Sequence, residues 1–117
     1  SIKCINRHSS LLPVNGGILP VFRSIQFNHS HTGVTVHEMR KEIDEGPILA
    51  QFPIPVYPND NISNLYKHCF NISYFMIVDA INEKYTKCRL PNAKKSYFSY
   101  PQIKDWNQFN RSSIKFN

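Results

Sequence analysis

The chain lacks long hydrophobic runs and has few cysteines. No apolar stretch approaches the roughly 18 residues of a transmembrane helix, and no segment resembles a signal peptide, so we expect no membrane interaction. Cys4, Cys69 and Cys88 are widely spaced and form no C-x-x-C pair, so their spacing indicates neither a metal site nor a disulfide framework. We interpret the three as buried, reduced thiols and expect a cytoplasmic protein.

Acidic residues are also scarce. Eight Asp and Glu against 14 Lys and Arg give a net charge of +6 over 117 residues. The basic residues are scattered, with short clusters at Arg40–Lys41 and Lys94–Lys95, and we therefore do not expect dedicated nucleic-acid binding. The charge equally suits an anionic cofactor tail or a nucleotide-linked substrate. A hydrophobic content of 41% is typical of one globular unit.

The most informative stretch begins at Asn6 and His8. In an extended segment, residues two apart project to the same side, so the amide and the imidazole can meet one substrate atom. An amide N–H can donate to an oxygen that becomes negative, and an imidazole exchanges a proton near neutral pH. Ser9 and Ser10 lie in no G-x-S-x-G elbow, so we interpret them as residues that hydrogen-bond within a loop.

Three ordered segments resemble the formyltransferases that use 10-formyltetrahydrofolate. Residues 5–17 are similar to the family's N-x-H-x-S-L-L-P…G signature, 32–39 to its T-G-V-T-x-H strand, and 42–51 to its x-h-D-x-G-x-I-h-x-Q segment. The resemblance implies an α/β chain that forms part of a Rossmann-like formyltransferase fold. We expect a short mixed sheet covered by one long helix, with the amino-terminal, nucleotide-binding-like half missing from an excerpt or a truncated product.

The resemblance also implies the site. Asn6, His8 and Asp44 match the family's catalytic residues, and no metal or covalent intermediate is needed. The folate co-substrate is expected at a loop made of Glu38, Met39, Arg40, Lys41, Glu42 and Ile43. The substrate side is expected at a loop containing Ser10, Leu11, Pro13, Gly16 and Gly17.

The role of His37 has two interpretations of equal weight: support of the catalytic site, or a strand histidine paired with the backbone. His29 and His31 lie two apart in a polar connector without a nearby carboxylate or thiolate, so we expect a solvated turn rather than a metal site.

Hydrophobic periodicity predicts the remaining elements. A strand is expected over 2–5, a short helix over 18–27 and a strand over 32–39. A strand over 48–56 contains Pro53 and Pro55, which favour a sheet edge. The longest helix is expected over 61–85 with Asp60 as its N-cap, and a short one over 102–111 that uses Ile103, Trp106 and Phe109.

We expect two parts, with the catalytic half over 1–90 and a carboxy-terminal extension over 91–117. The leading hypothesis is formyl transfer from 10-formyltetrahydrofolate to a primary amine of a small or nucleotide-linked sugar. A fragment of a methionyl-tRNA formyltransferase, a glycinamide ribonucleotide formyltransferase and a non-catalytic remnant that binds a partner protein are the alternatives. The partner could be a missing amino-terminal half or a second copy in a homodimer.

Overall fold

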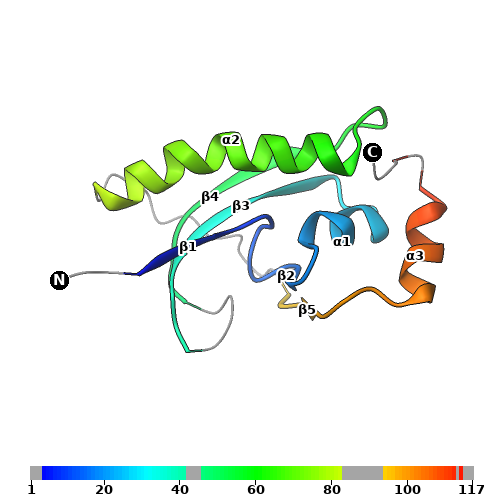
Figure 1. The fold of residues 1–117 in the computed structure, drawn as a ribbon, viewed down its shortest axis with the longest axis horizontal. Coiled ribbons are helices and arrows are strands. Elements are labelled where there is room, and N and C mark those ends of the chain that lie inside the picture. The colour runs from blue at the N-terminus through cyan, green and yellow to red at the C-terminus, as the bar shows by residue number, and fades with distance from the viewer. Residues whose placement is uncertain (1–3, 42–45, 83–93, 113, 115–117) are drawn as a thin grey trace.

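The computed structural model describes residues 4–41, 46–82, 94–112 and 114. A three-stranded sheet is built from β1 (Ile5–His8), β3 (His31–Glu38) and β4 (Ile48–Pro55) in the order β1-β3-β4, with both pairs antiparallel. One long helix, α2 (Ile62–Ile81), lies across one face of this sheet, as expected (Figure 1). Parallel pairing occurs as well, but in a separate two-stranded sheet rather than in one mixed sheet.

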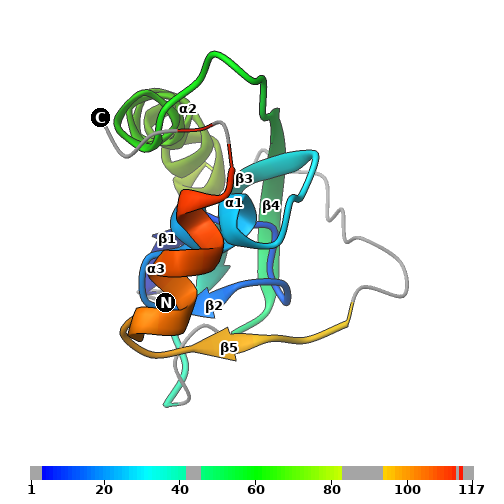
Figure 2. The ribbon, with the colours of Figure 1, turned by 90° about the vertical axis from the view of Figure 1, so that its right-hand side faces the viewer.

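That second sheet joins β2 (Gly16–Gly17) to β5 (Tyr97–Phe98), segments 80 residues apart in the chain. Its two strands lie side by side below the small helix α1 (Figure 2). Two-residue strands are too short to produce a hydrophobic pattern, so the sequence did not predict this pairing.

Alternation along β3 separates the two faces of the larger sheet. Val34 and Val36 are fully buried and join the hydrophobic core with Leu65 and Cys69 of α2. Thr35 and His37 lie on the opposite face, since side chains alternate along a strand. A register shift occurs between Val36 and His37. The predicted strand over 32–39 is thus confirmed to within one residue.

The first strand extends further than predicted, while residues 2 and 3 of the predicted strand lie outside the described residues. β1 contains Asn6 and His8 rather than ending before them, and Asn6 pairs with His37 and His8 with Thr35. At the other side of the sheet, β4 is an edge strand, which confirms the position that Pro53 and Pro55 favoured.

The long helix confirms its predicted start but not its predicted N-cap. The Asn61 side chain accepts a hydrogen bond from the Asn64 backbone N–H at 2.7 Å, which makes Asn61 the cap. The Asp60 carboxylate instead accepts from the Tyr57 N–H at 2.8 Å and closes the preceding turn. The helix ends at Ile81 with Asn82 as its C-cap, four residues before the predicted end at 85.

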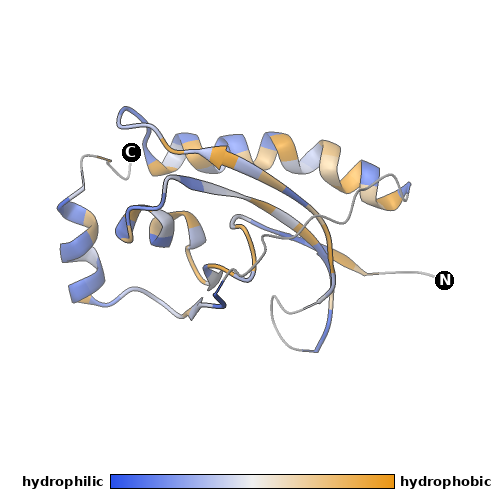
Figure 3. Ribbon diagram, turned by 180° about the vertical axis from the view of Figure 1, so that it is seen from behind, coloured by the Kyte–Doolittle hydropathy of each residue, from blue (hydrophilic) through white to orange (hydrophobic). Residues whose placement is uncertain are grey.

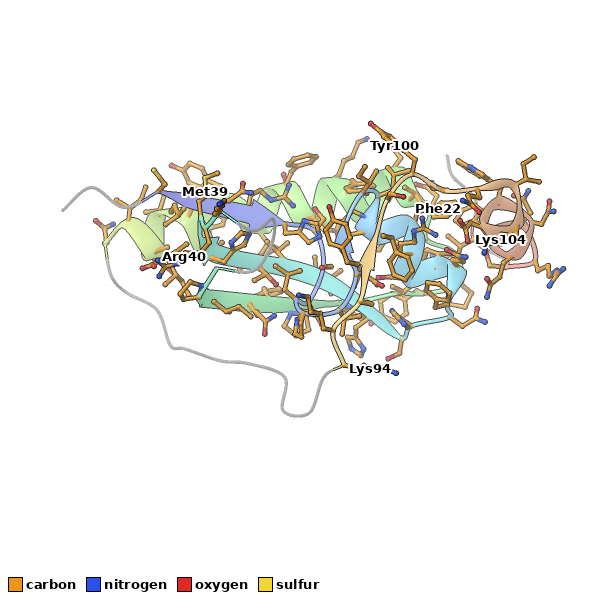
Figure 4. The ribbon with its side chains drawn as sticks, turned by 90° about the horizontal axis from the view of Figure 1, so that it is seen from below. Phe22, Met39, Arg40, Lys94, Tyr100 and Lys104 are labelled. Carbon is orange, nitrogen blue, oxygen red and sulfur yellow. The ribbon has the colours of Figure 1, made fainter. Side chains whose placement is uncertain are left out.

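Two short helices pack against each other at one end of the molecule. α1 (Pro20–Gln26) begins later than predicted because Leu19 has a positive φ of 52°. α3 (Ile103–Asn110) has a capping box made by Gln102 and Asp105. The Phe22 ring of α1 stacks on Phe109 with centroids 4.8 Å apart, and Figure 4 shows Phe22 between the two helices. Of the predicted packing residues in α3, Ile103 is instead exposed.

The interpretation of the cysteines needs one correction. Cys69 is buried, but Cys4 is exposed, because it precedes the sheet at the start of β1. Cys88 lies outside the described residues. In the part of the chain that the structure describes, no helix is long and apolar enough to cross a membrane, and no group of three or more His, Cys, Asp or Glu side chains is placed to hold a metal ion.

Candidate active site

The strand β1 carries Asn6 and His8 on one face and Arg7 on the other. Arg7 points toward α2, where its guanidinium lies 4.7 Å from the centroid of the Phe70 ring. Burial against the helix lowers the pKa of Arg7. Since strand side chains alternate, Asn6 and His8 project to the face that α2 does not cover. The structure therefore places the predicted amide and imidazole on one side of the sheet.

The loop that follows β1 is fixed to this same face by Thr35. The Thr35 hydroxyl donates to the Ser10 carbonyl at 2.7 Å and accepts from the Leu12 N–H at 3.0 Å. Gln51 of β4 donates from Nε2 to the Leu12 carbonyl at 2.7 Å and to the Thr35 hydroxyl at 3.1 Å. Side chains of two neighbouring strands thus replace backbone pairing for a loop that crosses the sheet.

Gly33 provides the space for this loop. A Cβ atom at Gly33 would lie 2.5 Å from Leu11 Cδ2 and 2.6 Å from the Phe52 carbonyl oxygen. Only a residue without a side chain lets Leu11 approach the strand this closely. The T-G-V-T segment therefore binds the loop in two ways. Gly33 leaves space for the Leu11 side chain, and the Thr35 hydroxyl bonds the loop backbone.

His8 is oriented by the far end of the same loop. Its Nε2 lies 3.0 Å from the carbonyl oxygen of Asn15. Because a carbonyl oxygen can only accept, Nε2 carries the proton and donates it. The loop thus fixes the orientation of the His8 ring through Nε2.

Asn15 itself is 2% exposed and has a positive φ of 56°. Its side-chain Nδ2 donates to the Ser24 hydroxyl at 3.1 Å and lies 3.3 Å from Nδ1 of His29. Burial lowers the pKa of His29, which favours the neutral ring, whose Nδ1 can accept this bond.

The structure describes the first four residues of the predicted folate loop, 38–41. Glu38 closes β3 and pairs with Arg40 at 3.1 Å, Met39 is 55% exposed, and Lys41 is exposed. Figure 4 shows Met39 and Arg40 at the end of the sheet farthest from α3. Glu42, Ile43 and the predicted catalytic Asp44 lie outside the described residues.

The base of this loop is closed by backbone contacts. The Glu38 N–H donates to the Pro47 carbonyl at 3.0 Å, and the Met39 N–H donates to the Cys4 carbonyl at 2.8 Å. A Cβ atom at Gly46 would lie 1.6 Å from the Glu38 carbonyl oxygen. The glycine therefore fixes where the segment between Glu38 and Gly46 leaves and rejoins the sheet.

His37 lies opposite Asn6 and is 2% exposed. Its Nδ1 lies 2.9 Å from the Glu38 carbonyl oxygen, which is the backbone contact that the second interpretation expected. His37 lies on the same face as Asn6, and its role in supporting the catalytic site stays a prediction.

The predicted substrate loop divides into buried and accessible residues. Ser10 is 1% exposed, and its hydroxyl donates to the Val14 carbonyl at 2.7 Å, as expected for a residue that hydrogen-bonds within the loop. Leu11, Pro13 and Gly17 are partly exposed. Gly16 is buried beside β5, where its N–H donates to the Ser96 carbonyl at 2.9 Å.

Three residues that hold the site were not assigned from the sequence: Asn15, Thr35 and Gln51. The pair Asn15-Gly16 is a strong turn signal that indicates a residue with positive φ, so it could have marked Asn15. Thr35 and Gln51 were recognised as motif positions, but their contacts depend on strand register, which the sequence alone does not fix.

Residues 1–81 match the model of the formyl transferase family. The chain belongs to the formyl transferase family. A methionyl-tRNA formyltransferase of Ehrlichia chaffeensis is 39% identical over 79 residues, which are 68% of this chain and 26% of that protein. The chain thus spans about a quarter of the length of that relative.

Solved structures extend the similarity beyond the matched region. An N-formyltransferase from Helicobacter canadensis, crystallised with folinic acid and dTDP-3-aminofucose, is 30% identical with a TM-score of 0.71, covering 87% of this chain and 38% of that one. A 4-N formyltransferase from Francisella tularensis is 34% identical with a TM-score of 0.67, covering 91% of this chain and 43% of that one. The Rossmann-like formyltransferase fold assigned to this chain is therefore confirmed.

Proposed function

We propose that the chain forms the catalytic half of an enzyme that transfers the formyl group of 10-formyltetrahydrofolate to a primary amine of a nucleotide-linked amino sugar. The observation that carries the proposal is the placement of Asn6 and His8 on the face of β1 that α2 does not cover, in a member of the formyl transferase family. The folate assignment is supported by the folinic acid bound to the Helicobacter relative.

In the proposed reaction, the amine nitrogen attacks the formyl carbon and the carbonyl oxygen becomes negative. Asn6 donates its side-chain amide to that oxygen, and the protonated His8 ring stabilises the same charge. Asp44 favours the charged imidazole and takes up, through water, the proton that the amine loses. The bond from the formyl carbon to N10 then breaks, and Asp44 returns that proton through water to N10 of the leaving tetrahydrofolate.

The choice of an amino-sugar acceptor is supported by the Helicobacter relative, which was crystallised with dTDP-3-aminofucose. The Francisella 4-N formyltransferase retains 34% identity over 91% of this chain. The methionyl-tRNA formyltransferase of Ehrlichia is 39% identical over 68% of the chain. Transfer to methionyl-tRNA is the second candidate, because that relative has the higher identity within its aligned segment.

We further propose that full activity needs additional strands beside β1. Among the described residues, β1 is a sheet edge without proline, whereas the other edge, β4, contains Pro53 and Pro55. On the β1 side of α2, where Arg7 meets Phe70, large apolar side chains are exposed: Phe70 59%, Tyr74 67% and Ile81 67%.

Figure 3 shows hydrophobic residues continuing along the later half of α2. A helix with apolar residues on more than one face is normally covered on each of them. The exposed apolar side chains are placed where a further strand, paired with β1, would lie under α2. This supports the expectation that the rest of a formyltransferase domain packs here.

The test is a formyl-transfer assay with 10-formyltetrahydrofolate and two acceptors, a dTDP-linked amino sugar and methionyl-tRNA. It is run on the chain alone and on the chain joined to the amino-terminal half of the Helicobacter relative. The proposal predicts transfer to the amino sugar, strongly increased by the added half. Preference for methionyl-tRNA would overturn the acceptor assignment, and no transfer to any amine by the joined protein would overturn the enzyme assignment.

A further inference from the structure

The carboxy-terminal segment 94–112 lies outside the region that the family model matches, yet it bonds directly to the loop that orients His8. The Ser96 hydroxyl accepts a hydrogen bond from the Asn15 N–H at 2.8 Å. The Asn15 carbonyl, on the other side of the same residue, accepts from His8 Nε2 at 3.0 Å. One buried residue therefore connects Ser96 to His8.

Backbone bonds hold the segment on both sides of Asn15. The Ser96 N–H donates to the Pro13 carbonyl, and the Gly16 N–H donates to the Ser96 carbonyl, both at 2.9 Å. The Ile18 N–H donates to the Phe98 carbonyl at 2.9 Å. These backbone hydrogen bonds, on both sides of Asn15, form a short ladder that fixes its conformation with the carbonyl directed toward His8.

Gly17 makes the close approach of this ladder possible. Its φ is +94°, and a Cβ atom there would lie 2.0 Å from the Phe98 carbonyl oxygen. No side chain can occupy that space, so a glycine is required both by conformation and by contact.

The segment is anchored at its far side by Arg23 of α1, which is 3% exposed. Arg23 donates from Nη2 to the Ser99 carbonyl at 2.9 Å, and its Nη1 lies 3.2 Å from the Asp105 carboxylate. Its guanidinium also lies 4.5 Å from the centroid of the Phe98 ring. One buried cation therefore ties α1, β5 and α3 together, as Figure 2 shows for the arrangement of these elements.

We propose that segment 94–112 is a positioning element for His8: by holding Asn15, it keeps the acceptor for His8 Nε2–H in place and so fixes the orientation of the imidazole ring. This rests on the proposed function only in taking His8 as catalytic. Ser96 and Asn15 are positioning residues, since they act through His8 and not on the substrate.

The test follows the His8 side chain by NMR in the 117-residue chain, with no need for activity. In the unsubstituted chain, the proposal predicts slow exchange of the His8 Nε2 proton with solvent, because that proton is bonded to the Asn15 carbonyl. In Ser96→Ala, exchange of that proton should accelerate about fivefold, which corresponds to the loss of one neutral hydrogen bond. Ser96→Thr retains the hydroxyl and should restore slow exchange.

Ser99→Ala is the matched control, because the contact of Ser99 with Arg23 uses its backbone carbonyl. It should leave His8 exchange unchanged. A chain that ends at residue 93 should lose the protection entirely. If that chain does not fold, the His8 exchange rates of Ser96→Ala, Ser96→Thr and Ser99→Ala still test the proposal.

Unchanged His8 exchange in a folded Ser96→Ala chain would overturn the proposal. In the active enzyme, Ser96→Ala should lower kcat with little change in KM for the amine. A changed His8 exchange in a protein that transfers no formyl group would support the positioning of His8 and refute the proposed function, so the two ideas fail separately.

Discussion

Replacement of Thr35 by valine tests how the site is built. The two side chains have nearly the same shape, but valine cannot bond the Ser10 carbonyl or the Leu12 N–H. Thr35 is fully buried, so water cannot replace the lost hydroxyl. Two buried groups left unsatisfied cost about 1–3 kcal/mol each, so we expect a loss of about 2–6 kcal/mol in the free energy of unfolding.

For a domain of this size, about 1 kcal/mol lowers Tm by roughly 4 °C, so the expected shift is roughly 8–24 °C. Thermal unfolding measured by circular dichroism gives this value directly. Thr35→Ser retains the hydroxyl and should lose about 1 kcal/mol, from one methyl group.

Thr32→Val is a second control, since the Thr32 hydroxyl makes a long contact of 3.5 Å with the Ser9 carbonyl. A Thr35→Val protein that melts with Thr35→Ser would refute the claim that this hydroxyl carries the loop.

Three further predictions concern Gly46, Asp105 and the two described cysteines. Gly46→Ala should destabilise the fold and abolish folate binding, because its Cβ atom would lie 1.6 Å from the Glu38 carbonyl oxygen. Gly16→Ala should be milder, since the atom nearest to its Cβ lies 3.3 Å away. Thermal melts and folate titrations measure both effects. Asp105→Asn should lower Tm at neutral pH but not in strong acid. The Gln102 N–H, and then the Gln26 side chain, hold the pKa of Asp105 below its usual value. The stabilisation by Asp105 is therefore present above its unfolded-state pKa and lost as the pH falls through its folded-state pKa. Equal effects of Asp105→Asn at both pH values would contradict this. In a Cys88→Ser chain, a thiol reagent should modify Cys4, which is exposed, faster than Cys69. Burial raises the pKa of the Cys69 thiol and so lowers its reactivity. Equal rates would show that α2 opens readily.

The sequence predicted the parts of the site that lie on long elements. The helix α2 and the strands β3 and β4 have clear periodicity, and the spacing of Asn6 and His8 predicted their shared face. What the sequence missed depends on tertiary contacts. Asp60 and Asn61 are both good caps, and only the geometry of the preceding turn makes Asn61 the cap and gives the Asp60 carboxylate to Tyr57.

The link from Ser96 through Asn15 to His8 could not be predicted for a related reason. It joins residues 81 positions apart through strands of two residues, which have no periodic signal. The exposure of Cys4 depends likewise on where the sheet ends, because β1 begins one residue later. The catalytic role of Asp44 stays a prediction from the resemblance, as do the folate roles of Glu42 and Ile43.

The central claim is that Asn6 and His8 act on the same carbonyl oxygen. It is tested most directly by a double-mutant cycle on the rate of formyl transfer, using Asn6→Ala, His8→Ala and the double variant in the active enzyme. Asn107→Ala and His68→Ala, both exposed positions on helices, serve as matched controls that should retain full rate.

Loss of one oxyanion donor should lower kcat about 100- to 1,000-fold in each single variant. Two groups that stabilise one charge are not independent, so the double variant should lose clearly less than the product of the two single losses. Losses that multiply fully, or single variants that keep the rate of the controls, would contradict the account.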